Sequence, residues 1–292
     1  MMEIKHTPVL LNEVISFINF SKHKVFLDLT VGEGGHSEEI LKRASNDSIL
    51  IGFDLDEEIL KIANQRLSKL NKKFYLFNEN YKDFYKKLKE ININGADFML
   101  LDLGFSSFQL ENGRGFSFLD EKSLHMGYSK EIKGADYYIN KLSKNELAYI
   151  FEEYGEIKGS EKIAEEIVKY RKNKKIETSK ELADIVEKVV KRKGKIHPAT
   201  KVFQALRIYV NKEFENLREF LFVFPDYLNK DGILEIISYH SVEDRIVKNA
   251  LKELEDMGKV VFLNKKVITP SQSEVKENRR SRSAKLRVVQ KI

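Results

Sequence analysis

The first third of the chain alternates short apolar runs with stretches in which apolar residues recur at helical spacing. Between residues 57 and 69, for example, Ile59, Leu60, Ala63 and Leu67 fall on one face of a helix. This alternation predicts βαβ units and a parallel sheet. We expect strands at 25–28, 49–54, 74–77 and 97–102, and helices that begin near residue 37 and span 57–69 and 84–91.

Strand signals stop after residue 104 and resume only near residue 232. The intervening residues show helical periodicity, for example at 146–153 and 160–171. Beyond them we expect a helical stretch at 200–224, a strand at 232–239, a helix at 242–254 and extended runs near 259–263 and 285–289. The predicted fold is α/β, with about seven strands, a core of residues 1–104 and 197–292, and a mainly helical insert, 105–196, between the fourth and fifth strands.

Composition narrows the possible classes of function. No apolar run is long enough to span a bilayer, and the N-terminal residues form neither a signal nor a transit peptide. We therefore expect a cytoplasmic protein with no membrane partner. The chain has no cysteine, which excludes disulfides, thiolate metal sites and cysteine nucleophiles. Methylation at carbon 5 of a pyrimidine through a thiolate adduct is excluded for the same reason.

The positive charge is concentrated in two segments, within a chain of net charge +6. Residues 265–292 contain nine Lys or Arg and two Glu, and residues 158–195 contain thirteen Lys or Arg and seven Asp or Glu. Such segments favour a nucleic-acid phosphate backbone as partner. For 158–195, solvated helix faces with paired charges explain the pattern equally well. In the C-terminal segment, the candidate phosphate-binding residues are Arg279, Arg280, Arg282, Lys285 and Arg287.

A glycine-rich loop follows the first predicted strand, from Asp28 to Ser37, and includes Gly34 and Gly35. At this position a ligand approaches the backbone closely and meets the amides of a helix start. Asp54 closes the next strand, where a carboxylate can accept hydrogen bonds from ribose hydroxyls. Together these features favour an adenosine-containing cofactor over a simple tight turn. Because Asp28 suits the ammonium of a methionine group better than a pyrophosphate, S-adenosylmethionine is preferred to NAD.

Asp102 ends the fourth predicted strand, and the loop after it contains Gly104, Ser106 and Ser107. Ligands of open α/β sheets bind at this carboxyl edge. A carboxylate there can hold an amine N–H and orient the nitrogen lone pair toward a methyl donor. Asp102 and Ser106 are therefore the candidates to position an acceptor amine. The alternative is a loop-capping carboxylate followed by turn serines, since no Gly-x-Ser-x-Gly sequence surrounds them.

A family resemblance is carried by segments that span nearly the whole chain in order. They are HTPVLLNE (6–13), GEGGHS (32–37), LLDLG (100–104), RGFSF (114–118), YGE (154–156), HPAT (197–200), FQALR (203–207), ISYHSVEDRIVK (237–248), and the run from Asn278 to SAKLR (283–287). Together they resemble the RsmH (MraW) family of ribosomal RNA small-subunit methyltransferases. The combination is specific, although no single segment would be.

The resemblance implies a class I, Rossmann-like methyltransferase core with a helical insert. It implies S-adenosylmethionine as methyl donor and the exocyclic N4 of one cytidine in 16S rRNA of the small ribosomal subunit as acceptor, with the insert and the basic tail contacting RNA. The cofactor residues that it implies are Gly34, Gly35, His36, Asp54, Tyr81, Asp102 and Gln109. No metal is expected, because neither His36 nor His240 has a partner at metal-ligand spacing. The oligomeric state stays open, with a homodimer as one option.

The segment 240–245 leaves the fifth predicted strand at the same edge of the sheet. We expect it to shape the side that faces RNA. A helix capped by Ser241, with Asp244 three residues later, explains half of this motif without any substrate.

Three departures from the family pattern keep other hypotheses open. Phe108 replaces a Pro, Arg279 stands where an Asn-Pro-Arg run is usual, and LHMGY (124–128) replaces a Leu-Asp-Met-Arg-Met pattern. The changes at His125 and Gly127 leave room for a non-catalytic ribosome-assembly factor that retains the cofactor pocket. A third hypothesis is an amino-methyltransferase that acts on DNA or protein.

Overall fold

The computed structural model describes residues 8–104, 113–129, 131–190 and 197–292, and the chain forms two compact units. One unit contains Met1–Phe105 and Phe214–Ile292, and the other contains Ser106–Glu213. The second unit is therefore inserted in the chain between two parts of the first. The sequence pattern predicts that the insert ends at residue 196, whereas the second unit extends to Glu213.

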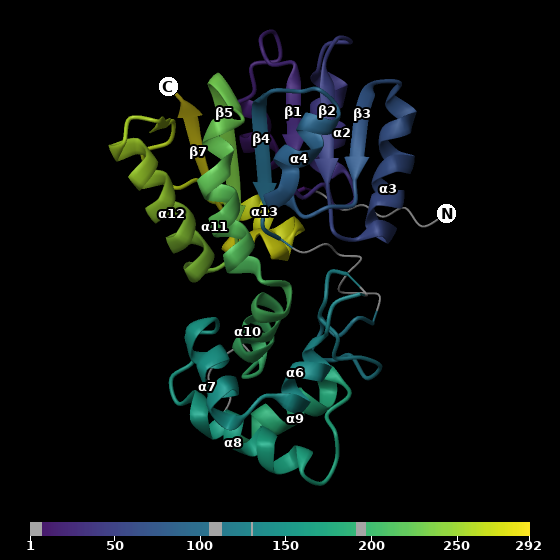
Figure 1. Ribbon diagram of the computed structural model, residues 1–292, viewed down its shortest axis with the longest axis vertical. Coiled ribbons are helices and arrows are strands. Elements are labelled where there is room, and N and C mark those ends of the chain that lie inside the picture. The colour runs from purple at the N-terminus through teal and green to yellow at the C-terminus, as the bar shows by residue number, and fades with distance from the viewer. Residues whose placement is uncertain (1–7, 105–112, 130, 191–196) are drawn as a thin grey trace. The chain divides into compact units, whose positions relative to one another are not determined.

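The first unit is built on a seven-stranded sheet of order β3-β2-β1-β4-β5-β7-β6 (Figure 1). Strands β1 to β5 are parallel, whereas β7 is antiparallel to β5 and β6. The strands are β1 (Val25–Asp28), β2 (Ile49–Phe53), β3 (Lys73–Phe77), β4 (Ala96–Asp102), β5 (Leu228–Ser238), β6 (Val260–Phe262) and β7 (Lys285–Lys291). The structure confirms the predicted α/β fold, and the inserted unit lies between β4 and β5.

Helices cover both faces of this sheet, which explains why its central strands are apolar almost throughout. One face packs against α4, α11 and α12 around Phe84, Phe220 and Leu251. The other face packs against α1 and α2 around Val14 and Ile40. The helices of this unit are α1 (Leu11–Ser16), α2 (Gly35–Arg43), α3 (Glu57–Leu67), α4 (Phe84–Glu90), α11 (Glu213–Val223), α12 (Ser241–Asp256) and α13 (Gln272–Glu277), with the short 3-10 helices η1 (Ser68–Leu70), η2 (Tyr81–Asp83), η3 (Phe224–Asp226) and η4 (Arg279–Ser283).

Among the described residues of the second unit, all regular secondary structure is helical. The helices are α6 (Ala135–Lys141), α7 (Lys144–Glu153), α8 (Ser160–Arg171), α9 (Ser179–Val189) and α10 (Thr200–Asn211). Their apolar faces share one core, which includes Phe151, Ile167 and Leu206. Capping boxes at Ser143 and Thr178 begin α7 and α9, so side chains satisfy backbone N–H groups at both helix starts.

The periodicity over 200–224 predicts one helix, but the structure has two. Lys212 adopts a left-handed φ of 51° and separates α10 from α11. Phe203 and Leu206 of α10 belong to the core of the second unit, whereas Phe220 of α11 belongs to the sheet unit. Because both helices are amphipathic, the apolar pattern continues across the break and hides the boundary. In the part of the chain that the structure describes, no helix is both long and apolar enough to cross a membrane.

Candidate cofactor and acceptor site

The residues predicted to bind a cofactor follow four neighbouring parallel strands at the edge where those strands end. The glycine loop follows β1, Asp54 follows β2, Tyr81 lies shortly after β3, and Asp102 ends β4. Since β3, β2, β1 and β4 are adjacent in that order, their carboxyl ends lie along one edge. Ligands of open α/β sheets bind at such an edge. The fold thus brings together segments that are far apart in the sequence.

The glycine loop leads directly into α2. Gly34 is the N-cap residue of α2, with a left-handed φ of 81°. Gly35 is needed for another reason, because a Cβ there would lie 2.6 Å from Cγ of Pro8. From the sequence, the approach of a ligand is the expected reason for both glycines. The structure explains Gly34 by backbone conformation and Gly35 by packing, while the N–H groups that start α2 have no partners within the helix.

His36 and Asp28 support this loop from inside the protein. His36 is buried, and its Nε2 lies 3.0 Å from the carbonyl oxygen of Val9. Asp28 is 1% exposed and accepts hydrogen bonds from Oγ of Ser37 (2.6 Å) and N of Thr30 (3.4 Å). Burial raises the pKa of Asp28, and nearby His36 opposes that effect. Asp28 is therefore a buried support of the loop, which differs from the ligand-facing role inferred from its position.

Asp54 is half-buried and fixed by two backbone donors. Its Oδ2 accepts a hydrogen bond from N of Gly32 (3.0 Å), and its Oδ1 accepts one from N of Asp56 (2.9 Å). A carboxylate has about four acceptor positions, so each oxygen keeps one for another donor such as a ribose hydroxyl. Burial raises the pKa of Asp54 to about 7, although both backbone hydrogen bonds oppose the rise. The bond to Gly32 joins the end of β2 to the glycine loop.

Tyr81 opens η2, shortly after β3. Its half-buried ring packs edge-on against Phe220 of α11, with ring centroids 5.9 Å apart. The ring is thus partly a core residue. Tyr81 follows β3, so it lies at the same edge of the sheet as Asp54.

Asp102 is half-buried at the end of β4. Its N donates to Oγ1 of Thr30 (2.8 Å), and its Oδ1 accepts from N of Gly104 (3.1 Å). The second bond is the loop-capping role that the sequence analysis left open. This hydrogen bond occupies one acceptor position of the carboxylate, and other positions remain for a substrate donor. Two further candidates at this edge, Ser106 and Gln109, lie outside the described residues.

Sequence reasoning missed Tyr239, which follows β5 next to Asp102. Burial, followed by the charge of the nearby Asp102 carboxylate, raises the pKa of Tyr239 well above its usual value. Only the parallel pairing of β4 with β5, which places Asp102 opposite Ile237, brings Tyr239 close to Asp102. That register could not be read from either segment alone.

The motif after β5 is a helix start held by side chains. The N-cap of α12 is His240, whose Nδ1 accepts from N of Glu243 (3.3 Å), so the predicted cap at Ser241 is wrong by one residue. Glu243 is 3% exposed. Its Oε1 lies 2.8 Å from Nε2 of His240, and its Oε2 accepts from N of Tyr239 (3.0 Å). These contacts fix the turn between β5 and α12.

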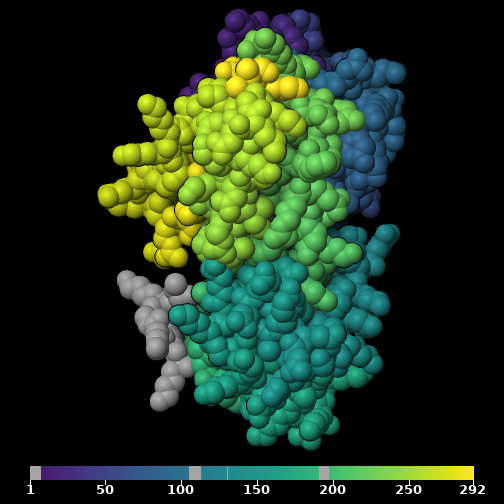
Figure 2. Space-filling model, turned by 60° about the vertical axis from the view of Figure 1, so that its left-hand side comes forward, coloured from purple at the N-terminus to yellow at the C-terminus, as the bar shows by residue number. Residues whose placement is uncertain are grey.

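The basic C-terminal segment divides into two parts. Arg279, Arg280 and Arg282 are exposed on η4. Figure 2 shows yellow, C-terminal parts of the chain at the surface of the sheet unit. Lys285 and Arg287 lie on β7 and pair with Asp244 at 3.1 and 2.8 Å. Burial opposes ionisation of Asp244, but the two cations outweigh it and lower its pKa. Lys285 and Arg287, which the sequence analysis assigned to phosphate contact, thus hold β7 to α12.

The departures at 125 and 127 form a matched pair within the second unit. Nδ1 of His125 accepts from N of Gly127 (3.1 Å), and its Nε2 lies 3.1 Å from the carbonyl oxygen of Ile132. A Cβ on Gly127 would lie only 2.6 Å from Cε1 of His125. The imidazole therefore occupies the space where a side chain at 127 would begin. Packing accounts for both departures together; the departure at Phe108 lies outside the described residues.

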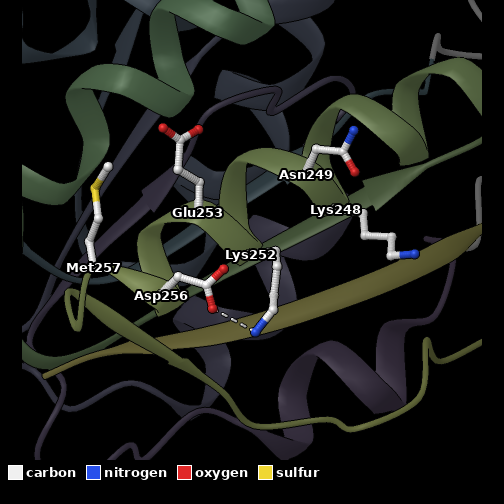
Figure 3. Close-up of a pocket in the computed structure, with 6 residues that line it drawn as sticks. All are labelled: Lys248, Asn249, Lys252, Glu253, Asp256 and Met257. Carbon is white, nitrogen blue, oxygen red and sulfur yellow. Dashed lines mark ion pairs between the residues drawn. The ribbon is translucent and has the colours of Figure 1, made fainter.

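A shallow hollow on the second half of α12 is separate from this sheet edge (Figure 3). Lys252 lies in it, paired with Asp256 over 2.8 Å. The hollow contains none of the predicted site residues, and the start of α12 is the end that adjoins the edge. Among the residues that the structure describes, no group of three or more His, Asp or Glu side chains is arranged to hold a metal ion.

Comparison with known proteins identifies the family. The profile of the MraW methylase family matches residues 3–292. Relatives of this chain carry the name "Ribosomal RNA small subunit methyltransferase H". The protein of Dictyoglomus thermophilum is 48% identical and covers 98% of this chain and 97% of its own. That of a Sulfurihydrogenibium species is 46% identical and covers 99% and 100%, and that of Clostridium botulinum is 43% identical and covers 100% of both. The chain belongs to the MraW methylase family.

Proposed function

We propose that this protein transfers a methyl group from S-adenosylmethionine to the exocyclic N4 of a cytidine in 16S rRNA of the small ribosomal subunit. The observation that carries the proposal is the single sheet edge at which the glycine loop, Asp54 and Asp102 meet. Family membership supports methyl transfer, and the names of the relatives support small-subunit rRNA as the substrate.

The cofactor would lie across the ends of β1, β2 and β3. Asp54 has acceptor positions left on both oxygens, which suits the two hydroxyls of a ribose. The half-buried Tyr81 ring would stack on the adenine, and Gln109 is the further contact that the family resemblance implies. Gly34, Gly35 and His36 shape the start of α2, whose first N–H groups, which have no partners within the helix, would face the methionine part. When bound, the cofactor supplies a methyl group already activated on a sulfonium.

The chain then has to orient the acceptor and relieve it of a proton. Asp102 accepts one N–H of the cytosine amine, so that the nitrogen lone pair points at the methyl group. Ser106, in the loop that follows, is a second candidate for this positioning. A nitrogen acceptor needs no covalent adduct, which agrees with a chain that has no cysteine.

RNA recognition falls to the second unit and to the exposed arginines of η4, Arg279, Arg280 and Arg282. Arginine binds phosphate oxygens through a planar fork of donors. Small subunits are assembled in the cytoplasm, where we place the protein.

The test is incubation with small subunits and a labelled methyl donor, followed by mass spectrometry of the digested rRNA. We expect N4-methylcytidine at one position, with Asp102→Asn lowering transfer by about 100-fold, within the usual range for loss of a positioned proton acceptor. Label on other bases, or on DNA or protein at equal rates, contradicts the proposal. RNA binding without any transfer would instead favour the non-catalytic assembly factor.

A further inference from the structure

Tyr239 packs against the turn that follows β4. Strands β4 and β5 pair in parallel with Asp102 opposite Ile237, and N of Leu103 donates to the carbonyl oxygen of Ile237 over 2.9 Å. This register brings Gly104 alongside Tyr239. A Cβ built on Gly104 would lie 2.9 Å from Cε2 and 3.1 Å from the hydroxyl oxygen of Tyr239. The absence of a side chain at Gly104 is what lets the turn lie directly on the aromatic ring.

The hydroxyl of Tyr239 also lies near the Asp102 carboxylate, close enough for the two groups to interact. Burial, followed by the negative charge of Asp102, raises the pKa of Tyr239 well above its usual value, and Glu243 and Glu274 add to this effect. The hydroxyl therefore stays protonated and is able to donate to the carboxylate. N of Gly104 donates to Oδ1 of Asp102, and Tyr239 lies beside the same carboxylate, so groups at the ends of two different strands adjoin it.

Tyr239 is itself held in place from α12. Its backbone N donates to Oε2 of the buried Glu243, whose Oε1 lies against the ring of His240. The ring of His240 in turn caps α12. A continuous set of contacts thus runs from the helix start through Tyr239 to Asp102.

We infer that Tyr239 is a positioning residue for methyl transfer, which fixes Asp102 and the Gly104 turn in the orientation that receives the acceptor amine. The inference rests on the proposed function, in which Asp102 accepts an N–H of that amine. A carboxylate has about four acceptor positions, so those not used by Gly104 and Tyr239 are directed to the substrate. No bond is made or broken at Tyr239, and it does not accept the departing proton because its own proton is retained.

The test compares Tyr239→Phe in the wild-type and Asp102→Asn backgrounds. Phenylalanine keeps the ring against Gly104 and removes only the hydroxyl. We expect kcat to fall about tenfold in the wild-type background, as for loss of one hydrogen bond to a charged group, with the RNA KM, the cofactor Kd and the Tm little changed. In the Asp102→Asn background the same change should cost less than twofold, because the group that Tyr239 orients is already altered.

A second measurement does not depend on activity. Carbon-13 NMR of labelled tyrosine Cζ, assigned with Tyr239→Phe, follows ionisation of Tyr239 as pH rises. We expect Asp102→Asn to lower the pKa of Tyr239, because one of the charges that raises it is removed. An unchanged titration, or equal losses of kcat in both backgrounds, overturns the inference. Absence of methylation by the wild-type protein would overturn the proposed function instead, and the titration would still decide whether Tyr239 and Asp102 interact.

Discussion

The backbone N–H of Gly32 donates to Oδ2 of Asp54 over 3.0 Å, which ties the glycine loop after β1 to the end of β2. The same carboxylate is half-buried, and burial raises its pKa to about 7. Asp54 is therefore close to half-protonated near neutral pH. Hydroxyl donors from a bound ribose would favour its charged form.

The first prediction concerns the protons exchanged when the cofactor binds. Binding should lower the pKa of Asp54 and release a proton, so affinity for S-adenosylmethionine should fall as pH drops below about 7. Calorimetry at pH 7 in two buffers of different ionisation enthalpy measures this release. Asp54→Asn should abolish it. Equal heats in both buffers for the wild-type protein would show that Asp54 does not change its protonation on binding.

The second prediction concerns His125 and Gly127. Gly127→Arg alone should lower the free energy of unfolding by about 2 kcal/mol, because its Cβ would overlap the His125 ring. Adding His125→Asp should recover most of that loss, since the smaller side chain vacates the space. Urea unfolding of the two single variants and the double variant gives the coupling energy. Additive losses would mean that the two departures are unrelated.

The third prediction concerns Glu235, in the middle of β5. Its side chain is fully buried, and neither carboxylate oxygen has a hydrogen-bond partner among the described residues. Leu100 and Val288 lie opposite it on the neighbouring strands. Glu235→Val should raise the free energy of unfolding by about 1–3 kcal/mol, the usual cost of an unsatisfied buried polar group.

The pH dependence of stability separates charge from polarity at this position. Burial raises the pKa of Glu235 well above its usual value, so the folded state holds this proton more tightly than the unfolded state. Its contribution to stability is full below the unfolded pKa and is lost as pH rises toward the folded pKa. Glu235→Gln should remove this dependence with a smaller gain than valine gives. A valine variant less stable than wild type would indicate a partner for the carboxylate.

The fourth prediction separates the two halves of the basic tail. Replacing Arg279, Arg280 and Arg282 with alanine should weaken RNA binding and reduce the salt slope by roughly two to three, with cofactor affinity and Tm nearly unchanged. Arg287→Ala serves as the contrast. It should lower the free energy of unfolding by about 2 kcal/mol, because it removes a charged hydrogen bond to the partly buried Asp244. If the triple variant keeps the full salt slope, the arginines of η4 do not contact phosphate.

Much of the sheet unit was predictable because a parallel sheet buries its strands as short apolar runs. The runs at 25–28 and 97–102 became β1 and β4, and the polar residues that end them, with Asp54, marked the edge of the site. In contrast, α13 was missed because none of its residues is buried, so no apolar periodicity marks it.

What the sequence could not supply were contacts that depend on register or conformation. The pairing of Tyr239 with Asp102 needs the alignment of β4 with β5, which are separated by the whole inserted unit. The positive φ of Lys212 ends α10, which belongs to that unit, but the apolar pattern of the sequence continues across this residue. In the sequence, Arg287 and Arg279 are equivalent basic residues of one segment. Only the structure shows that Arg287 pairs with Asp244.

The most direct measurement is calorimetric titration of the wild-type protein and Asp54→Asn with S-adenosylmethionine, its demethylated product and NAD. We predict that the wild-type protein binds the first two and not NAD. The Asp54 variant should bind the sulfonium compound at least about tenfold more weakly, since a hydrogen bond to a charged group is lost. Tight binding of NAD, with no response to the sulfonium compound or its product, would contradict the account.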